Sequence, residues 1–292
     1  MAGSTANTPP FRRAAIIGTG LIGGTFALAL RKQFPRISLI GYARAGSAAQ
    51  ALERGVVDEI APDLASAVRA ADLVYIAMPI GATIEALGAI AESAEPHALV
   101  TDAGSTKVVI CRAAQEHFRS GALFLGGHPM AGKEHSGIEH ADAGLFRGAP
   151  YALVAVEATA DSRVKQFAEV LRGIGAQPIW CDADTHDWAV GIVSHLPQLV
   201  SVALASVVQD ETDETGMPLA LAGPGLQDML RLAGSPYEVW RDIFLTNTEN
   251  ASRALDRLAQ AVDHLRTSLA SKDLEQEFHA ANELYKTLRK PL

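Results

Sequence analysis

Short apolar runs alternate with amphipathic helical stretches over the first 181 residues. The run AAIIG at 14–18 precedes a helical pattern over 21–33, and ISLIGY at 37–42 follows it. A strand, a helix and a strand in this order predict a βαβ unit with parallel strands. Five further strands are predicted, with a helix after Ala160 between the last two: LVYIAMP at 73–79, ALVTDAG at 98–104, ALFLGG at 122–127, YALVAV at 151–156 and AQPIW at 176–180. The alternation predicts an α/β fold built on a Rossmann-type, doubly wound parallel sheet.

After Asp182 the strand pattern stops and a helical period takes over. Helices are predicted over 184–210, 215–232, 236–247, 249–271 and 273–288. The change of period predicts a dinucleotide-binding domain over 1–181, with a loose tail at 1–10, and an all-helical domain over 182–292. We expect the helical domain to bind substrate and to pack on the first domain with a cleft between them.

A glycine-rich turn joins the first predicted strand to the first predicted helix. Gly18, Gly20 and Gly23 have the spacing of a dinucleotide-binding turn, and Leu21 and Ile22 open the helix. The first glycine permits the tight turn, the second lets the backbone approach a pyrophosphate, and the third lets helix pack on strand. A helix N-terminus also favours the negative charge of phosphate. We therefore predict a NAD(P) site here, against the alternative of a glycine-rich turn that binds nothing.

The end of the second predicted strand bears on the choice of cofactor. NAD-binding turns have an acidic residue here for the ribose hydroxyls, but this chain has Ala43. Arg44, with Ser47 nearby, has the chemistry to bind a 2′-phosphate, which favours NADP over NAD. The alternative is that Arg44 is a solvated residue that stacks on adenine. Pro79 and Asp102 follow or end other strands, and we expect both to contact the cofactor.

Four further motifs lie in regions where ligands bind. Two follow strands in the first half: DAGSTK at 102–107 and GGHPMAGKE at 126–134. Two lie in the helical half: SHLPQ at 194–198, and DMLR at 228–231 followed by WRD at 240–242. In this order and spacing, and together with the glycine turn, they resemble the prephenate and arogenate dehydrogenases of tyrosine biosynthesis, the TyrA family, from about residue 13 to residue 288.

This resemblance implies oxidative decarboxylation of a cyclohexadienyl substrate. Hydride leaves ring carbon four for the nicotinamide, the ring carboxylate leaves as carbon dioxide, and the ring becomes aromatic. His128 takes the place of the family's catalytic histidine, which accepts the proton of the ring hydroxyl. Ser105 matches the serine that reaches the substrate hydroxyl or the nicotinamide. By themselves these residues could also be a loop histidine and the N-cap of a helix.

The resemblance also implies a substrate pocket in the helical half. Arg231 matches the arginine that binds a substrate carboxylate, and its apolar neighbours predict a buried guanidinium. Asp228, one turn earlier, would orient it, although an exposed pair has the same spacing. His195 matches a pocket histidine, against the alternative of a hydrogen-bonded core residue. Two further pocket positions are matched, by Glu134 and Trp240.

Departures from the family leave the substrate open. Gln198 stands where many prephenate-preferring members have a second histidine, so the preference between prephenate and arogenate is not predicted. The family dimerises through its helical domain, which implies a homodimer. One rival is a 4-amino-4-deoxyprephenate dehydrogenase, and another is a non-catalytic NADP-binding sensor. A 3-hydroxy-acid dehydrogenase usually has a catalytic lysine on a helix of its second domain. This class is disfavoured, because the lysines of the helical half lie near its C-terminus, at Lys272, Lys286 and Lys290.

Composition narrows the partners to small molecules. A net charge of −8 argues against nucleic acids and anionic membranes. The two cysteines, Cys111 and Cys181, form neither a disulfide framework nor a metal motif, and no metal is expected. The longest apolar stretch is interrupted by His195 and Pro197, and no secretion signal is seen at the start, so we expect a soluble, cytoplasmic protein.

Overall fold

The computed structural model describes residues 9–133, 135–155, 160–270 and 274–289. Strands and helices alternate in the first half: β1 (Arg13–Ile17), α1 (Leu21–Gln33), β2 (Ser38–Tyr42), α2 (Ala45–Glu53), β3 (Glu59–Ile60), α3 (Leu64–Val68), β4 (Leu73–Ile76), α4 (Ile80–Ser93), β5 (Leu99–Asp102), α5 (Val108–His117), β6 (Leu123–Pro129), β7 (Pro150–Ala155), α6 (Ser162–Gly173) and β8 (Gln177–Trp180). The predicted fold class is confirmed. The short strand β3 is the one strand that the apolar runs did not predict.

The eight strands found in the described residues form one sheet in the order β3-β2-β1-β4-β5-β6-β7-β8. Strands β1 to β6 are parallel, but β7 is antiparallel to β6, and β8 is parallel to β7. The predicted doubly wound sheet is therefore parallel except between β6 and β7, near one end. The cause is the connection from β6 to β7, whose described residues contain a 3₁₀ turn, Ile138–His140, and no crossover helix. Strand β7 consequently starts at the sheet edge where β6 ends.

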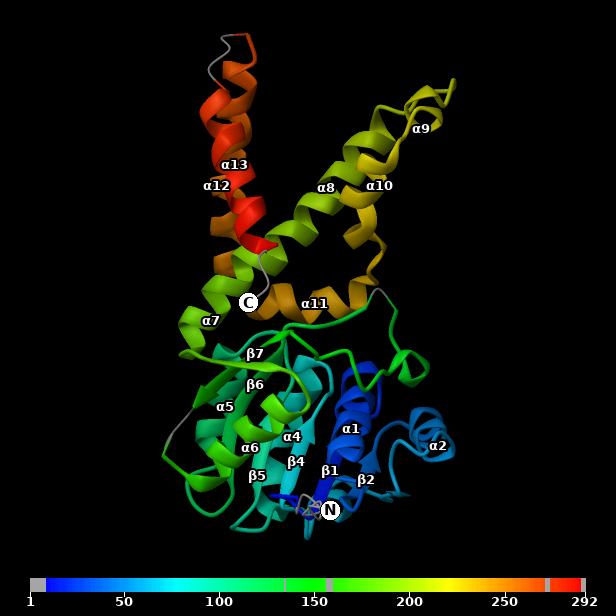
Figure 1. Cartoon of the computed structure of the whole chain (residues 1–292), viewed down its shortest axis with the longest axis vertical. Helices are drawn as coiled ribbons and strands as arrows, with labels where there is room; N and C mark the ends of the chain where they lie inside the picture. Colours follow the sequence, from blue (N-terminus) through cyan, green and yellow to red (C-terminus); the bar gives the residue numbers. More distant parts are fainter. Residues whose placement is uncertain (1–8, 134, 156–159, 271–273, 290–292) are drawn as a thin grey trace, which may run out of the picture.

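Helices cover both faces of the sheet (Figure 1). Successive strand residues point to opposite faces, so Ile16 and Tyr75 pack in one core with α1 and α6, and Ile17 and Val74 pack in another with α4 and α5. Phe26 of α1 stacks on Tyr75, with ring centroids 3.8 Å apart. These two cores hold the strand ends, where the chemistry-bearing residues lie, on a rigid frame.

The described residues of the second half form helices joined by turns. It comprises α7 (Ala183–Val190), a π-helical segment (Gly191–His195), α8 (Leu196–Asp210), α9 (Met217–Ala220), α10 (Pro224–Leu230), a 3₁₀ turn (Arg231–Gly234), α11 (Tyr237–Thr246), α12 (Thr248–Ser268) and α13 (Glu275–Leu288). The helix predicted over 215–232 is broken, because Pro224 lacks an N–H and Gly223 before it is extended. Helix α11 lies across the sheet edge (Figure 1). Two helical arms project beyond it, one formed by α8, α9 and α10 and the other by α12 and α13.

One described helix, Ala183–Asp210, has the length and hydropathy of a membrane span, with a mean hydropathy of 1.6. The expectation that His195 and Pro197 interrupt this stretch is wrong. The π-helical segment ends just before Leu196 and Pro197, and its wider turn accommodates a proline ring that would crowd a regular helix. Of its most apolar window 28% is buried, and the helix carries the buried polar residues His186, Asp187 and His195.

Candidate active site

The carboxyl ends of the parallel strands meet at one edge of the sheet, below α11. Strand β1 lies between β2 and β4, so the order of the chain reverses there. In open α/β sheets, ligands bind at this kind of switch point. The glycine turn follows β1, the exposed Pro79 precedes α4, and His128 lies near the end of β6. The fold therefore brings the predicted cofactor and catalytic positions to a common edge.

The glycine turn has the backbone that a dinucleotide requires. Gly18 has a φ of 96°, and a side chain there would collide with the carbonyl of Ala77. A side chain at Gly23 would collide with the carbonyl of Gly18, so helix α1 packs directly on the turn. Gly20 is the N-cap of α1, and a side chain there would meet open space. The first turn has no acidic residue and no side-chain cap, which leaves its amides for an anion.

The residues after β2 lie beside this turn. Arg44 is exposed at the N-terminal end of α2. Ser47 is held to the turn, since its hydroxyl lies 3.1 Å from the hydroxyl of Thr19. Leu21 and Ile22, the first residues of α1, are half-buried. The turn and the start of α2 are thus joined around the space where an adenosine ribose would lie.

Asp102 differs from its predicted role. It is fully buried and forms an ion pair with the equally buried Lys107. Its carboxylate also accepts hydrogen bonds from the backbone N–H groups of Gly104, at 2.8 Å, and Gly127, at 3.0 Å. The side chain therefore holds the loop after β5 against β6, and it has no exposed atom to offer a cofactor.

His128 is buried in β6, with 8% of its surface exposed. Its Nδ1 lies 2.9 Å from Nε2 of His186 on α7. Burial, and then the neighbouring His186, Lys107 and His195, hold the pKa of His128 well below its usual value. The imidazole is consequently neutral at physiological pH and able to accept a proton.

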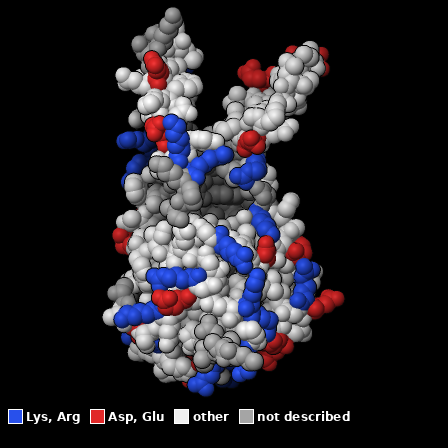
Figure 2. All heavy atoms as spheres, viewed as in Figure 1, with Lys and Arg blue, Asp and Glu red and all other residues white. Residues whose placement is uncertain are grey.

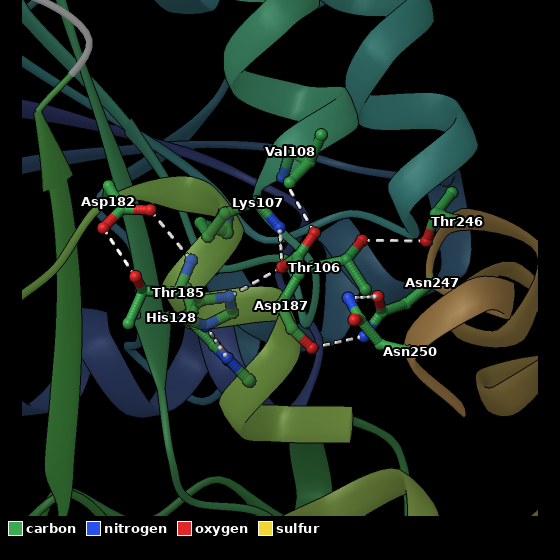
Figure 3. A network of polar contacts seen from close by, with 12 residues as sticks. Thr106, Lys107, Val108, His128, Asp182, Thr185, Asp187, Thr246, Asn247 and Asn250 are labelled. Atoms are coloured by element: carbon green, nitrogen blue, oxygen red, sulfur yellow. Dashed lines mark hydrogen bonds and ion pairs between the residues drawn. The ribbon is translucent and has the colours of Figure 1, made fainter. Parts of the chain in front are cut away.

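Asp187 connects the two domains behind His128 (Figure 3). Its carboxylate accepts hydrogen bonds from the backbone N–H groups of Lys107, at 2.7 Å, and Val108, at 2.9 Å, and thereby caps α5. Its Oδ1 also lies 2.7 Å from Nδ1 of His186. Because Asp187 supplies this cap, Ser105 does not, and the half-buried Ser105 lies just before the capped turn.

His195 lies at the end of the π-helical segment and is 1% exposed. Its Nδ1 lies 3.2 Å from Nδ2 of Asn247, which also donates to the carbonyl of Asp187. Its ring packs edge-on against Trp240 and Phe244 of α11. His195 is therefore a hydrogen-bonded buried residue, and this does not exclude the pocket role that the family resemblance implies. Trp240 is half-buried and stacked on Phe244.

The pH dependence of stability follows from His195. Burial lowers the pKa of His195 to about 4, against 6.5 for an ordinary histidine. The unfolded chain thus binds a proton that the folded chain does not, so stability is complete above pH 6.5 and falls as the pH approaches 4. Between pH 7 and pH 5 we expect this residue to reduce the free energy of unfolding by about 2 kcal/mol. Urea unfolding at both pH values measures it, and His195→Gln should lose this part of the dependence.

Arg231 lies in the 3₁₀ turn after α10 and is exposed, so the prediction of a buried guanidinium is wrong. Its apolar neighbours Leu226, Leu230 and Ala233 are half-buried on a helical arm and do not form a closed core around it. Its turn is held to α8 close to His195, since Gln198 donates to the carbonyl of Leu232 at 3.0 Å. Asp228 is exposed on α10. Glu134 lies outside the described residues.

The surface is hollowed between the sheet domain and the two helical arms (Figure 2). Lys and Arg side chains lie on both sides of this hollow on the face shown. Positive charge at the rim favours anionic small molecules, since it raises their local concentration. This surface is compatible with a dinucleotide and a carboxylate-bearing substrate.

Three contributors to the site were not predicted: His186, Asp187 and Asn247. His186 and Asp187 continue a polar stretch that begins at Asp182, so the local pattern is that of an exposed helix start and does not indicate that they are buried. The spacing of these residues does not reveal their partners, because His128 is 58 positions away in the chain. Asn247 lies between two helices, in a place typical of a simple cap.

Comparison with known families assigns both halves of the chain. Residues 26–180 match the model "Prephenate dehydrogenase, nucleotide-binding domain", and residues 182–289 match "Prephenate dehydrogenase, dimerization domain". The chain belongs to the prephenate dehydrogenase family. This confirms the family and the activity predicted from the motifs: NAD(P)-dependent prephenate/arogenate dehydrogenase chemistry in tyrosine biosynthesis.

Relatives support the family over nearly the whole chain. A prephenate dehydrogenase of Bacillus subtilis is 35% identical over 90% of this chain and 71% of its own length. A solved prephenate dehydrogenase from Aquifex aeolicus, in complex with hydroxyphenyl propionate and NAD+, superposes with a TM-score of 0.85 at 26% identity and covers 98% of both chains. Synechocystis arogenate dehydrogenase gives a TM-score of 0.77 at 31% identity, over 95% of this chain and 98% of its own.

Proposed function

We propose that His128 is the catalytic base of a prephenate or arogenate dehydrogenase. The observation that carries this role is a buried, neutral imidazole at the cofactor edge of the sheet. His128 Nε2 would take the proton of the hydroxyl on ring carbon four, while hydride leaves that carbon and the ring carboxylate departs as carbon dioxide. Aromatisation of the ring supplies much of the driving force, so the protein has chiefly to orient the substrate and remove one proton.

The cofactor would lie along the glycine turn. Gly18, Gly20 and Gly23, with the backbone N–H groups of Leu21 and Ile22, would hold the pyrophosphate at the start of α1. Pro79, at the start of α4, would line the same edge. When bound, the oxidised nicotinamide supplies the hydride acceptor. Ser105, on the loop after β5, would bind the substrate hydroxyl or the nicotinamide amide.

We infer a preference for NADP over NAD from Arg44, which is exposed where a 2′-phosphate would lie. Arg44→Ala should raise KM for NADP by about 10- to 100-fold, because a charge-assisted hydrogen bond to phosphate is lost. KM for NAD should change little. Arg36→Ala, an exposed arginine before β2, is the matched control. Equal effects of Arg44→Ala on both cofactors would instead support stacking on adenine.

The helical half would supply the substrate pocket. Arg231, oriented by Asp228, would bind a substrate carboxylate, while His195 and Trp240 would lie against the ring or its side chain, and Glu134 would complete this pocket. His195 is neutral, and its Nδ1 faces the amide of Asn247. Its Nε2 is therefore the protonated nitrogen and acts as a donor. Gln198 positions the Arg231 turn through Leu232, and prephenate and arogenate both remain candidates.

We also propose a homodimer formed through the helical arms. Most of the large exposed apolar side chains in the described residues lie in the helical half, on the arms and on the helices at their base: Trp188, Ile192, Val193, Val202, Val207, Met217, Leu219, Leu221, Met229, Tyr237, Val239, Leu245, Val262, Leu265, Leu269, Phe278, Leu284, Tyr285 and Leu288. Isolated arms cannot cover so much apolar surface, whereas a second copy can. Both described cysteines are free thiols, which fits a cytoplasmic enzyme.

Sedimentation velocity tests the dimer. We expect a mass about twice that of one chain, and Val207→Asp on α8 should shift the protein to monomers, because it places a charge in an apolar interface. Leu52→Asp, at an exposed apolar position on α2, should leave the dimer intact. A wild-type protein that sediments as a monomer would contradict the proposal.

The proposed reaction is tested by following reduced nicotinamide with purified protein, prephenate or arogenate, and NAD or NADP. We expect turnover with at least one pairing. Absence of turnover with all four, but activity with 4-amino-4-deoxyprephenate, would move the assignment to that substrate. Cofactor binding without turnover on any of the three would support the non-catalytic sensor.

A further inference from the structure

Behind His128 lies a chain of buried polar side chains that the reaction described above does not use. His186 is 3% exposed and Asp187 is 1% exposed. Both belong to α7 in the helical domain, whereas His128 belongs to β6 of the sheet domain. Two hydrogen bonds join the three residues in sequence, at 2.9 Å and 2.7 Å. Desolvated groups arranged in this way interact strongly, because little water screens them.

The positions of the protons in this chain follow from Asp187. Its carboxylate accepts hydrogen bonds from two backbone N–H groups, of Lys107 and Val108, so it acts as an ionised acceptor. Nδ1 of His186 must then carry the proton in their shared hydrogen bond. Nε2 of a neutral His186 is consequently an acceptor, and Nδ1 of His128 must donate to it. This leaves Nε2 of His128 unprotonated, as a base requires.

We propose that His186 and Asp187 are positioning residues that fix the tautomer of His128 and draw off the proton that it accepts. This inference rests on the proposed role of His128 as the base. When Nε2 of His128 takes the substrate proton, the proton on Nδ1 passes to Nε2 of His186. His128 becomes neutral again, with its proton on Nε2, and the positive charge moves to His186 beside the carboxylate of Asp187.

The surrounding charges favour this direction of transfer. A protonated His128 would be desolvated and close to Lys107, whose ammonium is held in place by Asp102. His195 also faces His128 but is neutral and already bonded to Asn247. His186, in contrast, contacts a carboxylate directly. The relay also couples the domains, since the base on β6 is correctly protonated only when α7 is docked.

The tautomer of His128 tests the proposal without any need for turnover. In protein labelled with ¹⁵N-histidine and assigned with His128→Gln, we expect Nδ1 of His128 to be protonated and Nε2 to be unprotonated. Asp187→Ala should weaken this preference, because Nδ1 of His186 then loses its acceptor and either nitrogen of His186 can carry the proton. A wild-type His128 that is protonated chiefly on Nε2 would overturn the proposal, whether or not the enzyme is active.

Kinetics supply the second readout. Asp187→Ala should lower kcat by about 10²- to 10⁴-fold with KM changed by less than about threefold, as expected when the tautomer of the base is no longer fixed. In His186→Gln the new Oε1 can still accept from His128, so the tautomer should be kept. The number of protons that move in the rate-limiting step, measured from kcat in mixtures of H₂O and D₂O, should fall by one. If Asp187→Ala does not fold, His186→Gln decides alone. Wild-type kcat and an unchanged number of these protons in His186→Gln would overturn the proton-transfer step.

If the wild type turns over none of the substrates, the proposed role of His128 fails. The tautomer measurement then still decides whether the relay sets its protonation.

Discussion

Replacing His128 by alanine is expected to lower kcat by about 10²- to 10⁴-fold. The variant retains the glycine turn and the Arg231 turn, so the KM values for cofactor and substrate should change by less than about threefold. The loss arises because no other group described at the end of β6 offers a neutral, buried nitrogen to the substrate hydroxyl. Steady-state assays of reduced nicotinamide measure both parameters.

A surface histidine provides the control for this variant. His97→Ala removes an exposed imidazole that pairs with Asp72 just before β5, at the opposite edge of the sheet from His128, and should leave kcat within about twofold of wild type. Residual activity of His128→Ala within about threefold of wild type would exclude His128 as the base. Ser105 would then become the next group to test, because it lies on the neighbouring loop.

Replacing Asp102 by alanine is expected to reduce the free energy of unfolding by about 3–5 kcal/mol. The substitution leaves the fully buried ammonium of Lys107 without its partner, and two backbone N–H groups lose their acceptor. Asp102→Asn combined with Lys107→Met should recover most of this loss, since both charges are removed and an acceptor oxygen is retained. Urea unfolding of wild type, single and double variants gives the comparison.

The same variants separate a structural role from a cofactor role. If Asp102 acts only within the protein, the folded double variant should bind reduced cofactor with a Kd within about threefold of wild type. A protein of unchanged stability but much weaker cofactor binding would show instead that Asp102 contacts the dinucleotide, as its position at the end of β5 first indicated.

The hydrophobic pattern of the sequence was sufficient to predict helices whose two ends are set by neighbouring residues. The helix predicted over 21–33 coincides with α1, since a glycine turn opens it and the chain breaks before a proline. The direction of β7 was not predictable from its apolar run, because direction depends on the connection and not on the strand. The helix over 215–232 was predicted through a Gly-Pro step that ends helices, so that error lay in the interpretation of the pattern.

The site residues also differ in how well the sequence predicts their positions and contacts. His128 and the glycine turn could be predicted as site candidates because their motifs are contiguous in the sequence, and the structure has both at the same edge of the sheet. The exposure of Arg231 could not be predicted, because a sequence with apolar neighbours is the same whether its helix is buried or projects as an arm. The contact of His128 with His186 and the cap that Asp187 provides to α5 depend on the docking of two domains, for which spacing along the chain carries no information.

The most direct test of the account is the stoichiometry of a single reaction. With the preferred substrate and cofactor, we expect one equivalent of carbon dioxide and one of reduced nicotinamide for each substrate molecule consumed, with both lost together in His128→Ala. Reduced nicotinamide without carbon dioxide, or consumption of substrate without either product, would contradict oxidative decarboxylation at this site.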